Sequence, residues 1–521
     1  MVSNKEINNN AAELDGMLKR MHEMVIQRKC ILQLSNIIFV NVKEGQDLHS
    51  VVNYRSPSEL YKAVDLALPE LGTGVDGTFD LIKKTLDYSV NSWNPRFMDK
   101  LYAGTNPIGV ISEFLLGVLN GNCHVYHVSP VLTLMEVEVT KAVGQLLGMG
   151  EHANGLFCPG GSASNLLAMV TARNYLYPSI KTSGYIPRPF NPTADYGKLK
   201  VFTSAHCHYS IDKAALVLGL GTDSIVKVPT NEKCQMRVDE LERLIQESVE
   251  RGETPFFINA TAGTTVMGAF DPIRSISTIA KKYNCWLHVD GSWGGSAIFS
   301  QTVREELGWL DGSGQADSFT MNPHKLLGVP LQCSMVVSPH EMIFPKANTL
   351  AADYLFHGNP YDLGAGTIGC GRRPDALKIF LAWKFYGSDG LGQRIDRALQ
   401  ASADFTDLVR ERKQFELVAD PSLFCQVCFW YVPKEIEEQV QTWKKDPQAW
   451  KTKMTHVIHL LHERVNHSGD FLVDHAPLDN LPHFFRIVIN APTVNVHRDL
   501  GALLDAIEDA SKNITWNEIS L

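Results

Sequence analysis

The chain has 521 residues, of which 44% are hydrophobic and 20% are charged. This ordinary globular mix excludes a disordered chain, a collagen-like repeat and a small disulfide-rich scaffold. The 48 Lys and Arg against 57 Asp and Glu leave a net charge of −9 without a basic block, so neither nucleic acid nor an anionic membrane is expected as a partner.

The first segment, residues 1–105, is expected to be mainly helical. Met17, Met21, Met24 and Val25 recur at helical spacing with polar residues between them. We interpret this pattern as a packing helix or dimer clasp rather than a regulatory tail. No basic region followed by an apolar core opens the chain, and no run of about 18 apolar residues occurs, so neither a secretory signal nor a membrane span is expected.

The middle segment, residues 106–384, alternates between helical and strand-like patterns. Helical patterns at 130–148 and 166–176 flank a glycine-rich stretch, and another covers 238–252. Short apolar runs predict strands at 200–205, 224–229, 255–261, 285–290 and 333–338. Such alternation favours an α/β layer with a mostly parallel sheet.

The last segment, residues 385–521, reads as a smaller α+β domain in which long helical stretches precede the strand-like runs FCQVCFWYVP and HFFRIVIN. The first run contains Cys425 and Cys428 at C-x-x-C spacing. Residues three apart in a strand point to opposite faces, so we favour buried packing over a zinc or redox role. The ten cysteines are scattered, which is typical of free thiols and predicts a cytoplasmic protein.

Four motifs carry residue types that are common in catalytic sites. In chain order they are Cys158–Asn165 (CPGGSASN), His206–His208 (HCH), His288–Asp290 (HVD) and Asn322–Lys325 (NPHK). Each motif also has a purely structural interpretation. A lone lysine is usually a solvated side chain, an aspartate after a strand usually caps a loop or helix, and GGSASN is a suitable sequence for the first turn of a helix. The HCH run lacks a third ligand at suitable spacing, so no metal is expected.

Together the four motifs fit the chemistry of pyridoxal 5′-phosphate (PLP). A lysine amine forms a Schiff base with the cofactor's aldehyde, and a carboxylate keeps the pyridine nitrogen protonated. Backbone N–H groups at a helix N-terminus cradle a phosphate, and an imidazole ring stacks on the pyridine face.

On these motifs, the sequence resembles the group II PLP-dependent amino-acid decarboxylases, in the branch of glutamate and cysteine sulfinate decarboxylases. The resemblance implies a type I PLP-dependent, aspartate aminotransferase-like α/β fold. This fold has a mostly parallel seven-stranded sheet with helices on both faces, a small C-terminal domain and an N-terminal helical segment. It also implies a homodimer with active sites at the interface. The motifs that carry it include NPRFMDKL, CPGGSASN, TSAHCHYS, NATAGTTVMGAFDPI, HVDGSWGGSA, ADSFTMNPHKLLGVPLQCS, CGRR and FFRIVINAP.

The resemblance also implies roles for single residues. Lys325 matches the lysine that binds PLP, Asp290 the carboxylate on the pyridine nitrogen, and His208 the stacked histidine. The other cofactor positions that it implies are Ala163, Ser164, Ser318 and Asn322 around the phosphate, and Thr264 and Ser292 beside the ring.

Phe97 and Lys100 lie in the segment expected to face the substrate. Enzymes for acidic substrates usually carry F-x-N-Q-L there, and Lys100 stands in place of the glutamine. A lysine can pair with a distal carboxylate or sulfinate of the substrate. The alternative is that Lys100 pairs with Asp99 or Glu113 and points away.

The implied reaction is α-decarboxylation of an acidic amino acid. Arg486 matches an arginine that binds the α-carboxylate, and Tyr354 matches a loop tyrosine that returns a proton to Cα. Glutamate, cysteine sulfinate and aspartate all remain open as substrates, because GVPLQCS favours the first and CGRR the second. The alternatives are decarboxylation of another amino acid, aminotransfer on the same fold, or a non-enzymatic protein on an inactive fold.

Overall fold

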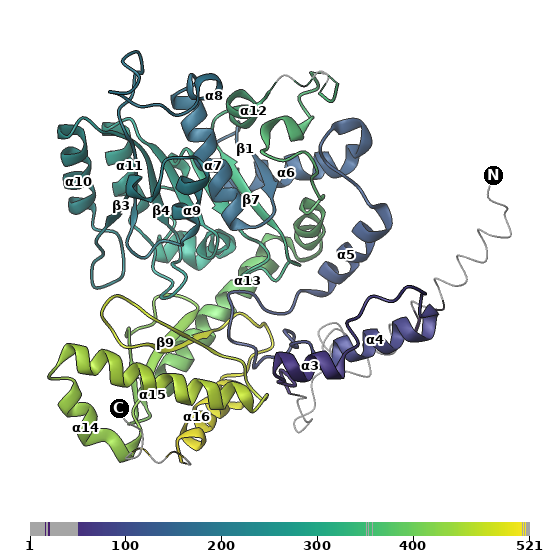
Figure 1. Ribbon diagram of the computed structural model, residues 1–521, viewed down its shortest axis with the longest axis vertical. Helices are drawn as coiled ribbons and strands as arrows, with labels where there is room; N and C mark the ends of the chain where they lie inside the picture. Colours follow the sequence, from purple (N-terminus) through teal and green to yellow (C-terminus); the bar gives the residue numbers. More distant parts are fainter. Residues whose placement is uncertain are drawn as a thin grey trace.

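The computed structural model describes residues 16, 19, 20, 50–350, 352, 354–356, 358–512, 514 and 516. The four apolar residues of the helix expected near the N-terminus lie outside this part. Figure 1 shows a large α/β body above a smaller C-terminal body, with α3 (Pro57–Ala63) and α4 (Gly74–Tyr88) to one side. Within the described part, no helix combines the length and apolar character needed to cross a bilayer.

The large body is built on a mostly parallel sheet of seven strands. From β6 to β3 all neighbours run parallel, whereas β7 runs antiparallel to both β1 and β6. The fold predicted from the motifs is therefore confirmed. In their order across the sheet the strands are β1 (Asn154–Cys158), β7 (Ser334–Ser338), β6 (Ser318–Met321), β5 (Trp286–Gly291), β4 (Thr254–Thr261), β2 (Leu199–Ser204) and β3 (Ile225–Val228).

Helices cover both faces of this sheet. One core, which includes Val143, Ile245 and Ile276, joins one face to α6, α10, α11 and α13. A second core, which includes Leu167 and Phe344, joins the other face to α7, α9 and α12. Strands covered on both faces are buried along their length, as β4 is after its first residue. The helices are α5 (Pro107–Leu119), α6 (Pro130–Leu146), α7 (Gly161–Leu176), α8 (Ile180–Ser183), α9 (Ser210–Val217), α10 (Val238–Glu250), α11 (Ile273–Lys282), α12 (Ile343–Asn348) and α13 (Ala376–Arg410).

Two strands of the sheet were not predicted from the sequence. β1 lies inside the glycine-rich stretch, and β6 lies inside the motif that leads to Lys325. Both are short, with five and four residues, and a short apolar run beside glycine gives little periodic signal.

The C-terminal body packs helices on a second, antiparallel sheet with the order β10–β11–β9–β8. Its core is separate from those of the large body and includes Phe429, Ile458 and Phe485. The elements are β8 (Phe415–Leu417), β9 (Gln426–Tyr431), β10 (Asp474–Ala476), β11 (Phe484–Val488), α14 (Glu437–Trp443), α15 (Pro447–His467) and α16 (Ala502–Lys512).

The long helix α13 connects the two bodies. The predicted boundary between residues 384 and 385 falls inside it, close to Gly387, whose φ of 68° breaks the helical path. A left-handed backbone of this kind costs glycine little. The domain limits themselves stay predictions.

Candidate active site

A cavity of about 240 Å³ opens at the carboxyl edge of the large sheet. β4, β5 and β6 run parallel and end there, and ligands of open α/β sheets bind at this edge. The lining residues come from loops far apart in the sequence: Gly161, Ser162, His208, Tyr209, Thr261, Gly263, Thr265, Asp290, Ser292, Trp293, Asn322, His324 and Lys325.

The Asp290 carboxylate is buried and held by two donors. The backbone N–H of Ser292 donates to Oδ1 over 3.0 Å, and Nδ2 of Asn165 donates to Oδ2 over 2.8 Å. Burial alone would raise the pKa of Asp290, but the Ser292 bond and the nearby charges of His208 and Lys325 outweigh it and lower that pKa. The carboxylate is therefore ionised at neutral pH.

A line of buried polar groups stands behind Asp290. Nε2 of His288 lies 3.1 Å from Oδ1 of Asn165, and Nδ1 lies 2.9 Å from the Ser318 hydroxyl, which accepts from the Trp286 indole N–H over 2.8 Å. Burial lowers the pKa of His288 to about 4, so the ring is neutral. Its proton then lies on Nε2, and Ser318 donates to Nδ1.

Lys325 follows β6 through a tight turn. Its backbone N–H donates to the carbonyl of Asn322 over 3.0 Å, and its own carbonyl accepts from Nδ2 of Asn490 over 3.0 Å. Lys325 lines the same cavity as Asp290. Burial lowers the pKa of the Lys325 amine, and the attraction of Asp290 opposes this shift.

His208 lines the same cavity from the loop before α9. Its Nδ1 accepts from the backbone N–H of Ser210 over 3.2 Å, which fixes the ring, and burial lowers the pKa of His208. The other histidine of the HCH run turns away, since Nε2 of His206 lies 3.0 Å from the Asp479 carboxylate. The two rings of the run do not converge on one ligand.

The N-terminus of α7 points its first residues into the cavity. Gly161 and Ser162 line it, and the first N–H groups of a helix have no partner within the helix. A Cβ at Gly161 would lie 2.6 Å from the Ser292 hydroxyl and 2.7 Å from Nδ2 of Asn322. Only glycine allows this close approach.

Several predicted cofactor residues lie behind the cavity lining rather than on it. Ala163 and Ser164 do not line the cavity; the Ser164 hydroxyl lies 2.7 Å from that of Ser334, which in turn donates to Asn322 over 2.6 Å. The Thr264 hydroxyl accepts from the N–H of Ala269 over 3.0 Å and stabilises a turn.

Ser318, predicted as a phosphate contact, also lies behind the lining, where its hydroxyl is bonded to His288 and Trp286. In contrast, Asn322 and Ser292 both line the cavity. Sequence reasoning missed Asn165, Gly161 and Ser162 as site residues, although all three belong to the CPGGSASN motif.

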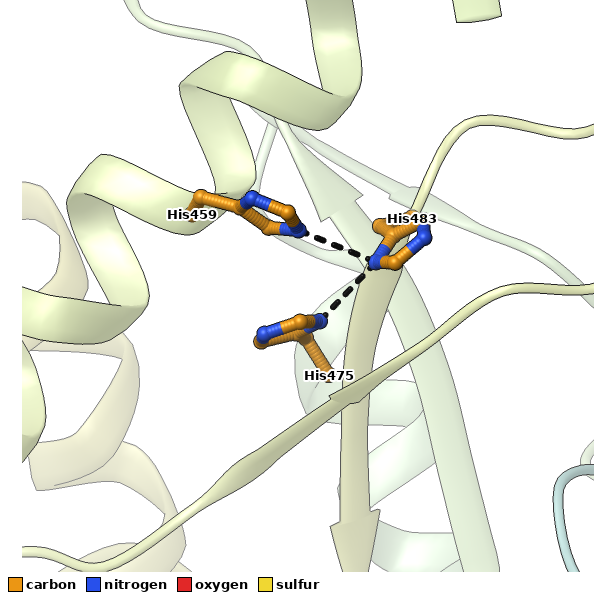
Figure 2. Close-up of side chains that lie close together, drawn as sticks. All are labelled: His459, His475 and His483. Atoms are coloured by element: carbon orange, nitrogen blue, oxygen red, sulfur yellow. Dashed lines mark hydrogen bonds between the residues drawn. The ribbon is translucent and has the colours of Figure 1, made fainter.

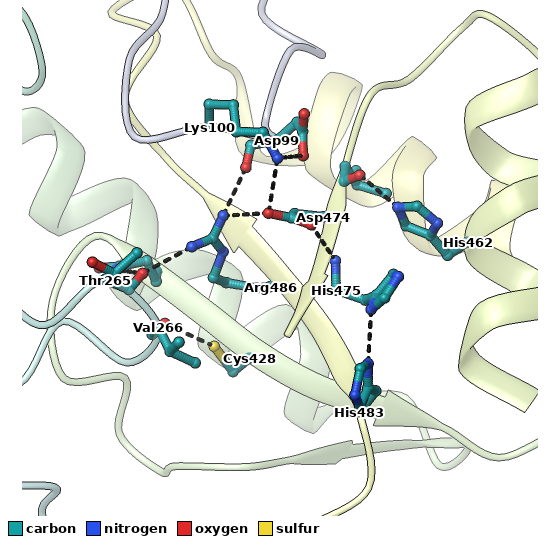
Figure 3. A network of polar contacts seen from close by, with 12 residues as sticks. Asp99, Lys100, Thr265, Val266, Cys428, His462, Asp474, His475, His483 and Arg486 are labelled. Carbon is teal, nitrogen blue, oxygen red and sulfur yellow. Dashed lines mark hydrogen bonds and ion pairs between the residues drawn. The ribbon is translucent and has the colours of Figure 1, made fainter. Parts of the chain in front are cut away.

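Arg486 lies on β11 beside the cavity, buried in a polar network (Figure 3). Its Nη1 donates to the carbonyl of Thr265 over 2.9 Å, and its Nη2 donates to Oδ2 of Asp474 over 2.5 Å. Within the described part of the chain, Nε of Arg486 has no hydrogen-bond partner. One donor of the guanidinium is thus buried without a partner among the described residues.

Lys100 joins the same network. Its Nζ lies 3.0 Å from Oδ1 of Asp99 and 3.2 Å from Oδ2 of Asp474. Of the two alternative partners predicted for Lys100, Asp99 is therefore confirmed and Glu113 is not, because the Glu113 carboxylate pairs with Arg373 and Lys378. Lys100 and Arg486 therefore share one carboxylate.

Two other predicted residues lie off the cavity. Phe97 is buried and forms a bridge with Leu472. Tyr354 is 88% exposed and does not line the cavity of its own chain. Cys425 and Cys428 are unpaired and buried in different cores, as the strand pattern predicts.

The cavity fits PLP by the chemistry of its donors. It combines an amine, an ionised buried carboxylate, an imidazole and a helix N-terminus, which match the aldehyde, the ring nitrogen, the ring face and the phosphate. Thr261 also lines the cavity, and its buried hydroxyl has no partner among the described residues.

Comparison with known proteins gives matches along most of the chain. The pyridoxal-dependent decarboxylase conserved domain matches residues 57–432. An L-aspartate decarboxylase of Metarhizium robertsii is 39% identical over 510 residues, 95% of this chain and 96% of the relative. A human acidic amino acid decarboxylase is 34% identical over 518 residues, 97% and 95% of the two chains. The crystal structure of mouse CSAD superposes with a TM-score of 0.87 at 34% identity, covering 96% of this chain and 99% of that one.

These matches confirm the family resemblance that the motifs predict, and with it PLP as the cofactor and amino-acid decarboxylation as the activity. The chain belongs to the pyridoxal-dependent decarboxylase family.

Proposed function

We propose that the protein removes the α-carboxylate of an acidic amino acid and that Lys325, Asp290 and His208 hold PLP for this reaction. The observation that carries the proposal is the convergence of these three side chains and the N-terminus of α7 on one cavity. The acidic-substrate names of the similar proteins support the substrate class.

Each lining residue then has a task. Bound PLP supplies an electron-withdrawing ring that accepts the electron pair of the broken Cα–carboxylate bond. Ionised Asp290 would keep a proton on the ring nitrogen, and the N–H groups of Gly161 and Ser162 would hold the phosphate. The lowered pKa of Lys325 favours the neutral amine, which is the form that attacks a carbonyl carbon.

Arg486 and Lys100 are proposed to bind the two acid groups of the substrate. The free Nε of Arg486 supports a role in binding the α-carboxylate beside the cavity. Lys100 Nζ lies near the Asp474 oxygen that Arg486 also contacts, so a second acid group finds a cation close by.

We also propose a homodimer, in which Tyr354 serves the cavity of the other subunit. Its side chain is exposed on its own chain and available to a neighbour. Ile111, Phe114 and Val118 form an exposed apolar stripe along α5, on the outside of the large body (Figure 1). As general acid, the Tyr354 hydroxyl would deliver a proton to Cα, worth about 10²–10⁴-fold in rate.

A cytoplasmic location is proposed on the state of the cysteines. The nine cysteines that the structure describes are all unpaired. Free thiols of this kind are typical of a reducing compartment.

The direct test is product analysis. Purified protein with PLP is incubated separately with aspartate, glutamate and cysteine sulfinate, and the amine, carbon dioxide and keto acid are each measured. The proposal predicts stoichiometric amine and carbon dioxide from at least one of the three. A keto acid without carbon dioxide would instead establish aminotransfer, and turnover of only neutral or cationic amino acids would refute the substrate class.

A further inference from the structure

We propose that His459, His475 and His483 form a binding site for one divalent transition-metal ion of the zinc type in the C-terminal body. The three rings come from separate elements: α15, β10 and the residue before β11. Figure 2 shows them turned toward one point, and one nitrogen of each lies within 4.8 Å of the other two. The cluster is distinct from the cavity lined by Lys325.

The first support is that hydrogen bonds among the three rings cannot all form at once. Nδ1 of His483 lies 3.0 Å from Nε2 of His459 and also 3.0 Å from Nδ1 of His475. A ring nitrogen carries either one proton or one lone pair in its plane, so Nδ1 of His483 completes only one of these two bonds. A cation between the rings accepts all three lone pairs at once.

The second support is the kind of side chain. Imidazole is the commonest metal ligand in proteins, and the three rings offer one nitrogen each to a single ion.

The third support is the spacing. Zinc binds imidazole nitrogen at about 2.0–2.1 Å, which places tetrahedral ligand atoms about 3.3 Å apart. The two distances of 3.0 Å at His483 are close to this value, and the nitrogens of His459 and His475 lie within 4.8 Å of each other. His459 is exposed, so the fourth position faces water. Three imidazoles suit zinc, copper or nickel rather than magnesium or calcium.

Neighbouring groups keep the ligand set at three. His462 packs edge-on against His475 with ring centroids 4.5 Å apart, but its Nε2 is engaged elsewhere, 3.0 Å from both the carbonyl of Val473 and Nδ2 of Asn466. The Asp474 carboxylate accepts from the backbone N–H of His475 over 2.9 Å and pairs with Lys100 and Arg486, so it is engaged away from the three rings.

The test uses the full chain with PLP bound. After metal is removed with a chelator, Zn²⁺ is titrated in competition with a chromophoric chelator, and Co²⁺ is added separately to record its visible absorption. We expect one tight Zn²⁺ per chain and the intense bands of tetrahedral Co²⁺. His459→Ala and His483→Ala should each weaken Zn²⁺ binding by about a hundredfold or more, since even the loss of a group that only orients a ligand weakens binding 10–100-fold.

His467→Ala is the matched control, because His467 is an exposed histidine on the same helix, α15. It should bind Zn²⁺ like the wild type. His459 is exposed, so His459→Ala is expected to fold and to keep the visible absorption of bound PLP. The proposal is overturned if the wild type binds no stoichiometric Zn²⁺, or if His459→Ala and His483→Ala bind it as tightly as the control.

Discussion

Replacing Asn165 with alanine tests how the protein holds Asp290. The Asn165 amide donates to Asp290 and to the Ser210 hydroxyl, and its oxygen lies 3.1 Å from Nε2 of His288. All four residues are buried. A hydrogen bond to a charged group contributes about 1.5–3 kcal/mol, which corresponds to about 10- to 150-fold in an equilibrium constant.

The assay is a titration of the apo-protein with PLP, followed by the visible absorption of the bound cofactor. We expect the Kd for PLP to rise by about 10- to 150-fold in Asn165→Ala, because Asp290 loses the donor that orients it. Loss of that donor also removes a hydrogen bond to the charged form, which raises the pKa of Asp290. As the pH is lowered, Asn165→Ala should therefore lose activity at a higher pH than the wild type does.

Asn259→Ala is the matched control. Asn259 is equally buried and donates to the Thr203 hydroxyl over 3.0 Å, on the strand beside that of His288. Both variants should unfold at lower urea concentration than the wild type, but only Asn165→Ala should bind PLP more weakly. Unchanged PLP affinity in Asn165→Ala, or an equal loss in both variants, would refute the reasoning.

Three further predictions concern substrate, stability and pH. Arg486→Lys should lower kcat/KM at least about tenfold, because lysine lacks the forked donors of the guanidinium group, while the absorption of bound PLP stays unchanged. A wild-type kcat/KM in this variant would show that Arg486 does not bind the substrate. Arg372→Met leaves the buried Glu136 carboxylate without its ion-pair partner and should lower the free energy of unfolding in urea by about 3–5 kcal/mol. Arg274→Met removes an exposed ion pair and should leave the urea midpoint unchanged. Equal midpoints in the two variants would contradict this prediction. Burial lowers the pKa of His288 and His324 to about 4 from an ordinary 6.5. Between pH 6.5 and pH 4 the unfolded chain therefore binds more protons than the folded chain, and the urea midpoint should decrease as the pH is lowered through this range. A urea midpoint that does not change with pH would contradict these pKa shifts.

Much of the fold could be predicted because the signal is local. The strands that lead to Asp290 and the helix over 238–250 carry clear apolar periodicity, and both occur where expected. β1 and β6 were missed because each is a short strand that lies beside glycine or polar motif residues, which obscure its apolar pattern.

The candidate site was predictable where a motif carries its chemistry, as for Lys325 and Asp290. It was not predictable where tertiary packing decides which side chain reaches the cavity. The α7 helix turns Gly161 and Ser162 into the cavity and Ser164 away, which spacing alone does not reveal. The pairing of Arg486 with Asp474 also depends on the register of β10 and β11.

The histidine cluster had no sequence signature at all. His459, His475 and His483 are separated by 16 and 8 positions and belong to a helix, a strand and a loop. Only the packing of α15 on the small sheet brings them together, so a search for ligand spacing passes over them.

The central claim is that Lys325 binds PLP covalently. The most direct measurement reduces the PLP-loaded protein with borohydride, digests it and sequences the modified peptide by mass spectrometry. The account predicts one phosphopyridoxyl group per chain, attached to the Lys325 amine and missing in Lys325→Ala. No adduct, or an adduct confined to another lysine, would contradict the account.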